Sequence, residues 1–547
     1  MKYLKFLFYA WVFLYTNPLQ SHSFLYSPPQ PITLVKGLGN LSHPVTTSVP
    51  QAQAFFNQGL TLIYAFNHDA AYWSFQKAAE LDSKMPMAYW GMALALGPNI
   101  NMDIDQEREQ KAYELIQKAL LLSADSPPNE KDYIQALSKR YSNEKHPDLK
   151  LLAIQYNQAM KALVEKYPYD LDAATLYAES SLNLNPWHQW DNSGEPLKGT
   201  LEIVALLEHI LKWDPNHLGA NHYYIHAIEA SKHPERALMS AQRLRDMLPA
   251  SGHILHMPSH IYILVGDYHM AALCNEKAVK ADQDYIRKFG LDGIYPVHYM
   301  SHNLYFLSRA YALEGRFSNA LRAAEELRCF YSPHFFTMPD LEYYEPAVLF
   351  TLLRFHRWNE ILDLKAPVSE MKISTLLWHF GKSMAYSALG DVKNAQTEQK
   401  IFLEEKFKIP DSTKFGYNQA KNVLQLAEYQ LNAKIAEMNN DSTLAIEWLS
   451  KAVDLQDQLY YNEPPDWYFP LRESLGALLL KDKQYQKAER VFNTDLEKHP
   501  LNGRSLFGLW KSLEAQAKHA DAYWIKQEFD TDRKSTRLNS SHTVISY

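Results

Sequence analysis

The chain has 547 residues, of which 46% are hydrophobic and 21% charged, so a large packed core is expected and disorder is not. Lysine and arginine number 55 and aspartate and glutamate 62, a formal net charge of -7, which argues against a nucleic-acid binder because such proteins need a basic face. The two cysteines, Cys274 and Cys329, are too few for a disulfide framework or a four-cysteine zinc site.

The first 23 residues have the pattern of a secretory signal peptide. Lys2 and Lys5 precede an apolar run, Phe6–Tyr15, that is too short to span a membrane, and Ser21 and Ser23 offer a small-residue cleavage site. The sequence therefore predicts export, to a periplasmic or extracellular location, with no stable membrane insertion after cleavage. An uncleaved anchor or a wrongly assigned start is the alternative.

From residue 51 onward, apolar residues recur at spacings of three and four, as in amphipathic helices, and no strand pattern persists. A set of small and large residues returns in one register: Gly59, Ala71, Phe75 and Ala78; Ala237, then Gly266, Ala271 and Ala278; Ile361 and Ala395; Gly476, Ala488 and Phe492; Gly508 and Ala520. These residues match positions 8, 15, 20, 24 and 27 of the tetratricopeptide (TPR) repeat, a pair of antiparallel helices. The pattern predicts an all-α, TPR-like superhelical repeat array, a solenoid with a concave groove.

The register also suggests a domain organisation. The expected segments are a signal peptide at 1–23, an extended segment at 24–50, N-terminal repeats at 51–200, histidine-rich repeats at 201–330 and C-terminal repeats at 331–531. The gap of 49 residues from Ala271 to Ala320 leaves room for an inserted loop, such as residues 282–296. Residues 532–547 resemble the translation of a sequencing adapter, so we treat this segment as an artefact.

Histidine is concentrated in one stretch of the chain. Eleven of the 22 histidines lie between His209 and His302, and three pairs are four residues apart, where random placement predicts about one pair. The repeat register places six of them, and Glu229, on the first helices of three consecutive repeats, on the side that lines the groove. Residues 34 apart should lie side by side, which would pair His222 with His256 and His226 with His260. The candidate metal ligands are His222, His226, Glu229, His253, His256, His260, His298 and His302.

Imidazole and carboxylate groups on neighbouring helices suit a transition metal such as zinc, copper or iron. The histidines exceed one tetrahedral shell, so two ions or a larger cluster are possible. Glu229 is expected to be a ligand or a general base, and Arg309 is placed to orient an anionic substrate. The alternative is that these histidines pack against tyrosines and hydrogen-bond locally. The phosphate-binding motif G-x-x-x-x-G-K-[ST] is absent, so no nucleotide is expected.

Several strings, among them GANHYYIHAIEAS, GHILHMPSHIY and EPPDWYFPLRESLGALLL, resemble a family of exported bacterial TPR proteins that is described only by the repeat. The resemblance extends from about Gln51 to Phe529, and the HYYIHAIEAS and HMPSHIY motifs are far more specific than a generic repeat. It implies a helical repeat fold and export, but no reaction. The competing hypothesis is an interaction scaffold that binds a peptide or protein partner in the groove without catalysis, and a scaffold should purify without stoichiometric metal.

Overall fold

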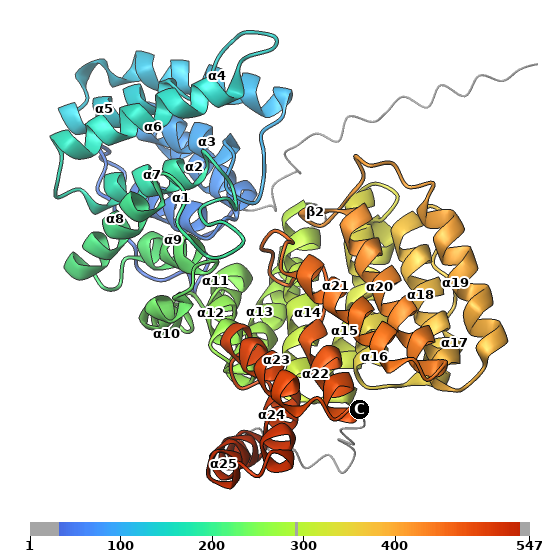
Figure 1. Ribbon diagram of the computed structural model, residues 1–547. Coiled ribbons are helices and arrows are strands. Elements are labelled where there is room, and N and C mark those ends of the chain that lie inside the picture. Colours follow the sequence, from blue (N-terminus) through green and yellow to red (C-terminus); the bar gives the residue numbers. More distant parts are fainter. Residues whose placement is uncertain (1–31, 290–293, 536–547) are drawn as a thin grey trace, which may run out of the picture.

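A computed structural model of the full chain describes residues 32–289 and 294–535. Helices follow one another in antiparallel pairs (Figure 1), and the only strands in the described ranges, β1 (Lys414–Phe415) and β2 (Asn418–Gln419), form a short hairpin. The all-α, TPR-like repeat fold predicted from the sequence is confirmed. None of the described helices combines the length and the hydropathy needed to span a bilayer. The predicted signal peptide lies outside the described residues.

The helices extend from residue 50 to residue 535, after a segment, residues 32–49, that contains neither helix nor strand. The N-terminal helices are α1 (Pro50–Tyr64), α2 (His68–Leu81), α3 (Pro86–Leu96), α4 (Gln106–Leu122), α5 (Pro128–Ser138), α6 (Leu149–Lys166) and α7 (Leu171–Leu182). The histidine-rich part contains α8 (Thr200–Trp213), α9 (Leu218–Ile228), α10 (Leu238–Leu244), α11 (Gly252–His256), α12 (Pro258–Leu264), α13 (Tyr268–Phe289), α14 (Ile294–Glu314) and α15 (Phe317–Tyr331).

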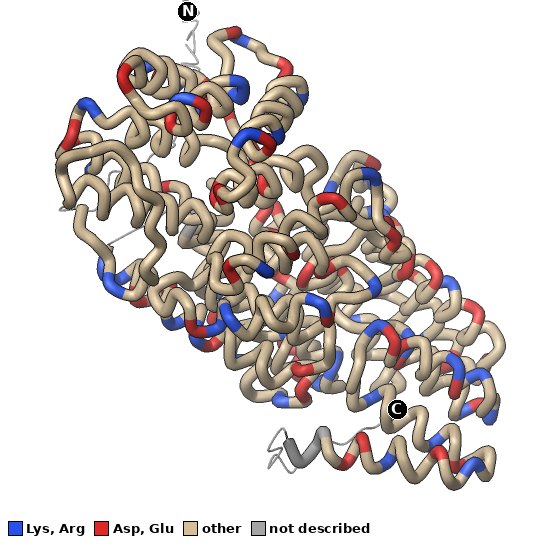
Figure 2. The backbone as a smooth tube through the Cα atoms, turned by 90° about the vertical axis from the view of Figure 1, so that its left-hand side faces the viewer, with Lys and Arg blue, Asp and Glu red and all other residues tan. Residues whose placement is uncertain are grey.

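The C-terminal helices are α16 (Ala347–Arg354), α17 (Trp358–Asp363), α18 (Lys372–Ala388), α19 (Val392–Lys406), α20 (Ala420–Met438), α21 (Ser442–Gln456), α22 (Leu471–Lys481), α23 (Tyr485–Lys498), α24 (Gly503–Ala515) and α25 (His519–Ser535). In the described part of the chain, four short 3-10 helices join longer elements: η1 (Ser123–Asp125), η2 (Pro234–Ala237), η3 (Ser332–His334) and η4 (Pro339–Tyr344). Acidic and basic residues are intermixed along the helices, and neither sign gathers on the face that Figure 2 shows.

The small residues of the repeat pattern allow helices to approach closely. The ring of Phe75 on α2 lies so near Gly59 of α1 and Gly91 of α3 that a Cβ atom at either glycine would stand 2.7 or 2.3 Å from it. The ring of Phe492 on α23 meets Gly508 of α24 in the same way, at 2.1 Å. One phenylalanine thus packs against helices of two consecutive repeats, which is the packing that the register predicted.

The alanines of the register are buried, with one exception. Ala71, Ala237, Ala271, Ala320, Ala395, Ala445 and Ala488 are all fully buried. Ala520 on α25 is exposed, and Ala522 is buried instead, so the register slips by two residues in the last described helix. This helix also continues to Ser535, past the predicted end of the repeats at residue 531, while residues 536–547 lie outside the described ranges.

The prediction of an inserted loop at residues 282–296 is largely wrong. Helix α13 continues to Phe289 and α14 begins at Ile294, so long helices fill most of the gap between repeats. Asp282 holds α13 against α14, because its buried carboxylate accepts a hydrogen bond of 2.7 Å from Asn303 Nδ2. Residues 290–293 lie outside the described ranges.

The C-terminal repeats contact the histidine-rich ones. Gly266, in the turn between α12 and α13, has a φ of 84°, and a Cβ atom there would lie 2.3 Å from the carbonyl oxygen of Pro500. The Tyr268 hydroxyl donates to the same carbonyl at 2.8 Å. This contact joins residues more than 200 positions apart. The segment between α21 and α22 (residues 457–470) also contacts the histidine-rich repeats, through the ion pair of Glu463 with Arg309 on α14.

Candidate metal centre

Six of the eight candidate ligands form two groups of three. They come from α9, α11, α12 and α14, the first helices of consecutive repeats. Within each group, one possible ligand nitrogen of every ring lies within 4.8 Å of the others. The first triad consists of His222, His226 and His253, and the second triad consists of His256, His260 and His302.

Helix geometry explains how the rings are distributed. His222 and His226 are one turn apart on α9 and share a face. His253 and His256 are both on the five-residue helix α11, but they belong to different triads, so α11 lies between the two. The predicted pairing is therefore only half right. Nε2 of His222 lies 3.1 Å from Nε2 of His253 rather than next to His256, whereas the rings of His226 and His260 are neighbours with centroids 6.0 Å apart.

Two rings present Nδ1 to an oxygen of the polypeptide that only accepts hydrogen bonds. Nδ1 of His222 lies 2.6 Å from the carbonyl oxygen of Tyr64 at the end of α1. Nδ1 of His256 lies 2.7 Å from Oδ1 of Asn275, whose amide group donates to the α13 backbone. Both nitrogens must therefore carry the proton of the neutral ring.

Glu229, at the end of α9, binds one ring of each triad. Its Oε1 lies 2.8 Å from Nδ1 of His226, and its Oε2 lies 2.6 Å from Nδ1 of His260. The Tyr461 hydroxyl also donates to Oε2, at 3.1 Å. Glu229 thus lies behind the imidazoles and orients them, whereas the sequence suggested a ligand or a general base.

The Nδ1 contacts fix the tautomers, so four Nε2 atoms are left with only a lone pair. Two of them, from His222 and His226, lie 3.1 Å apart, and those of His256 and His260 lie 2.8 Å apart. Two acceptors at this distance repel unless a proton or another cation lies between them. Burial, reinforced by the neighbouring imidazoles, lowers the pKa of His222 and His256 well below the ordinary value, so a proton is disfavoured.

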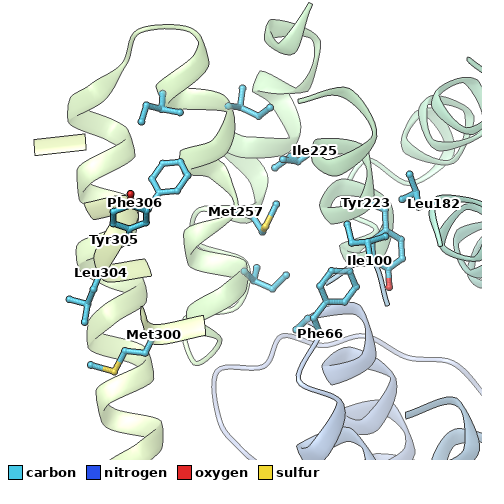
Figure 3. Packing of buried hydrophobic residues seen from close by; sticks show 14 of the residues in the cluster. Phe66, Ile100, Leu182, Tyr223, Ile225, Met257, Met300, Leu304, Tyr305 and Phe306 are labelled. Atoms are coloured by element: carbon cyan, nitrogen blue, oxygen red, sulfur yellow. The ribbon is translucent and has the colours of Figure 1, made fainter. Parts of the chain in front are cut away.

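One phenylalanine packs against each triad. Phe66, just after α1, has its ring centroid 4.5 Å from that of His222, and Phe306 on α14 lies 5.0 Å from His256. Figure 3 shows the two phenylalanines on opposite sides of Met257. These apolar rings limit the access of water to the ligand nitrogens.

Three segments that are distant in the sequence meet beside His226 and Glu229. The ring of Trp187, in the loop after α7, lies 5.4 Å from that of His226. Tyr417, in the β1–β2 hairpin, lies 5.7 Å from Trp187, and Tyr461 contacts Glu229 as described. Residues from outside the helix pairs therefore contact the first triad and Glu229, which the repeat pattern did not predict.

Two predicted site residues lie elsewhere. His298 has a side chain that is 32% exposed, stands 3.6 Å from Asp340 and belongs to neither triad. Arg309 is buried, and its Nη1 donates to Glu463 Oε2 at 2.7 Å, so it is held in an ion pair rather than directed at the triads.

A third cluster in the N-terminal part lacks the opposed acceptors. It contains His43, Asp170 and Asp172, with Nδ1 of His43 2.7 Å from Oδ2 of Asp172. His217 accepts from the Ala220 backbone N–H through Nδ1, so its Nε2, 3.3 Å from Asp172, is the donor. Donors face acceptors in each of these contacts, so hydrogen bonds alone satisfy the cluster.

Sequence reasoning missed the groups that hold the rings from outside. Asn275 had a detectable signal, because it stands at position 24 of its repeat, where a large apolar residue is expected. Trp187 lies in the loop between α7 and α8, outside the helix pairs that the repeat pattern describes. Tyr64, Phe66 and Tyr461 had no local signal, because they reach the site from far along the chain.

No protein-family model matches the sequence, and neither does any curated protein. Among solved structures, the chain is similar to yeast Tom70, with 12% identity and a TM-score of 0.33 over 86% of this chain and 96% of that one. It is also similar to a human IFIT1 dimer, with 11% identity and a TM-score of 0.34 over 89% of this chain and 96% of that one. For the TPR domain of P58(IPK), the identity is 12% and the TM-score 0.22 over 86% of this chain and 99% of that one. Because these TM-scores are below 0.5, the assignment of the repeat fold rests on the helix pairing and the glycine–phenylalanine contacts.

Proposed function

We propose that the protein binds two transition-metal ions, one in each triad, with zinc, copper and iron as the candidate metals. The opposed, unprotonated Nε2 atoms carry the proposal, because a cation between them replaces a repulsion with coordination. Metal–nitrogen bonds of ~2.0–2.1 Å place the ligands of a tetrahedral ion about 3.3 Å apart. The separation of 3.1 Å between Nε2 of His222 and Nε2 of His226 is close to that value.

Each triad would hold a metal ion with a coordination position left open. Three protein nitrogens leave a four-coordinate ion with one open position, whereas structural zinc sites are closed by four protein ligands. The Glu229 carboxylate would fix the tautomers of His226 and His260 and make both rings more basic. We leave the reaction unassigned, since binding proteins and enzymes use the same ligands.

Export is part of the proposal and is supported by the pattern of the first 23 residues.

Metal analysis by plasma mass spectrometry after mild, tag-free purification tests this function. We expect two equivalents of metal per chain. The variant His256→Ala should lose an ion from the second triad and keep its helical circular dichroism, while His298→Ala, outside both triads, should match the wild type. A folded wild-type protein that takes up no stoichiometric zinc, copper or iron would refute the proposal.

A peptide-binding scaffold is the second candidate, and one observation favours it. A cavity of 390 Å³ lies on the C-terminal repeats, lined by residues of α18, α20, α22 and α24. Lys434 and Lys481 border it and both pair with Glu437. The variant Ser474→Arg adds an obstacle at an exposed lining position. If the protein is a scaffold, Ser474→Arg should abolish binding of the peptide or protein partner and leave the metal content unchanged.

A further inference from the structure

The two triads are close enough for their ions to act together. Facing rings of different triads have centroids 6.0 Å apart for His226 and His260 and 6.2 Å apart for His253 and His256. One carboxylate, that of Glu229, reaches both triads, at 2.8 and 2.6 Å. Two ions held by these nitrogens would therefore be neighbours, and both would lie close to the Glu229 carboxylate.

The protein supplies little negative charge to this pair. The six ligands are neutral imidazoles, and Glu229 is the carboxylate hydrogen-bonded to them. Glu463, another buried carboxylate nearby, is neutralised by Arg309 at 2.7 Å. Two divalent ions would thus leave three positive charges uncompensated, and five of the six rings are at most 5% exposed. An unbalanced buried charge costs several kcal/mol, so the centre favours an additional anion.

The open coordination positions provide the place for that anion, and packing limits its size. Three nitrogens per ion leave each four-coordinate ion one ligand short. The rings of Phe66, Phe306 and Trp187 pack against those of His222, His256 and His226, with centroid distances of 4.5, 5.0 and 5.4 Å. A ligand of a few atoms fits such a site, whereas an extended substrate does not.

We infer that the two ions share one small anion of one to three heavy atoms, such as hydroxide or azide, bound between the triads. This inference rests on the proposed function. The anion completes the coordination of both ions and offsets part of their charge.

Azide titration of the copper-loaded protein tests the inference. The metal-free wild type is loaded with two equivalents of Cu(II), and sodium azide is followed by its charge-transfer absorption to copper and by electron paramagnetic resonance. We expect saturation at one azide per two copper ions and loss of the resonance signal, because bridged Cu(II) spins couple. The variant His302→Ala, which removes one ligand of the second triad, should weaken azide binding about tenfold or more, whereas His298→Ala, one turn earlier on α14, should not.

The possible outcomes separate the two proposals. Failure to bind copper or another transition metal is seen before azide is added, and it refutes the metal-binding function itself. Two azides per chain, unchanged signals of isolated Cu(II) ions, or no azide binding would overturn the shared anion and leave two independent metal sites. The ratio of azide to copper in the wild type decides the matter even if His302→Ala does not fold.

Discussion

Replacing Glu229 by Gln tests how the two triads are held. The carboxylate accepts a hydrogen bond from Nδ1 of His226 at 2.8 Å and from Nδ1 of His260 at 2.6 Å. Glutamine has nearly the same size but only one acceptor oxygen, so it can accept from one ring alone. The Nδ1 of the other ring then faces an amide N–H donor, so that ring must either turn or carry its proton on Nε2 instead. A protonated Nε2 cannot bind the metal ion.

The size of the effect follows from the position of this carboxylate. Burial tends to raise the pKa of Glu229, but the electrostatic attraction of the His260 and His226 rings and the hydrogen bonds that they donate outweigh it and lower the pKa to about 2. The group is therefore ionised at neutral pH and stabilises bound cations. Loss of such an outer partner weakens metal binding by about 10- to 100-fold, or roughly 1.4–2.7 kcal/mol. We expect this loss at one ion, and a smaller one at the other.

Competition with a chelator measures both affinities. Metal-loaded Glu229→Gln should release one ion at a chelator concentration that leaves the wild type with two, with an unchanged circular dichroism spectrum. Glu130→Gln is a matched control, because Glu130 is also buried but contacts Thr46 rather than either triad. If Glu229→Gln kept both ions with wild-type affinity, the tautomer argument would be wrong.

Three further predictions concern stability. Burial raises the pKa of Asp282 to about 7, so the folded protein holds a proton that the unfolded chain releases above pH ~4, and stability should fall by up to roughly 4 kcal/mol as the pH rises to 7. Urea unfolding of Asp282→Asn should show a flatter pH dependence than the wild type, and equal slopes would contradict this. Gly508→Ala should cost about 1–3 kcal/mol, since its Cβ would meet the Phe492 ring at 2.1 Å, and an unchanged denaturation midpoint would count against that packing. Deleting residues 536–547, which show no apolar period, should leave the melting temperature unchanged. A fall of several degrees would show that this segment is not a sequencing artefact.

The helical period and the repeat length are sufficient to predict most of the site. They determine which face of a helix a residue occupies, so the neighbouring positions of His222 and His226, and of His226 and His260, need no knowledge of distant contacts. The same rule cannot place His298, which precedes the first turn of the helical register and stands beside Asp340 instead. It also cannot tell whether Glu229 binds the metal or accepts hydrogen bonds from Nδ1 of the histidines, because both roles use the same helix face.

The remaining parts depend on how the superhelix closes. Tyr64 precedes His222 by 158 residues, and Tyr461 follows Glu229 by 232 residues. Contacts over such separations result from the summed rotation between many repeats, and small errors in that rotation accumulate along the array. Local sequence patterns therefore indicate the inner face of the groove but not the segments that cover it.

The contact of residues 457–470 with Glu229 affects how the molecule unfolds. In an open solenoid each repeat contacts only its neighbours, and the ends can fray without disturbing the middle. Here the hydrogen bonds of 3.1 Å from Tyr461 to Glu229 and 2.8 Å from Asn192 to Gln458 close a ring of contacts across the array. Fraying of the repeats around α21 and α22 would uncover the imidazoles, so retention of metal during limited proteolysis should report on the integrity of helices that contribute no ligand.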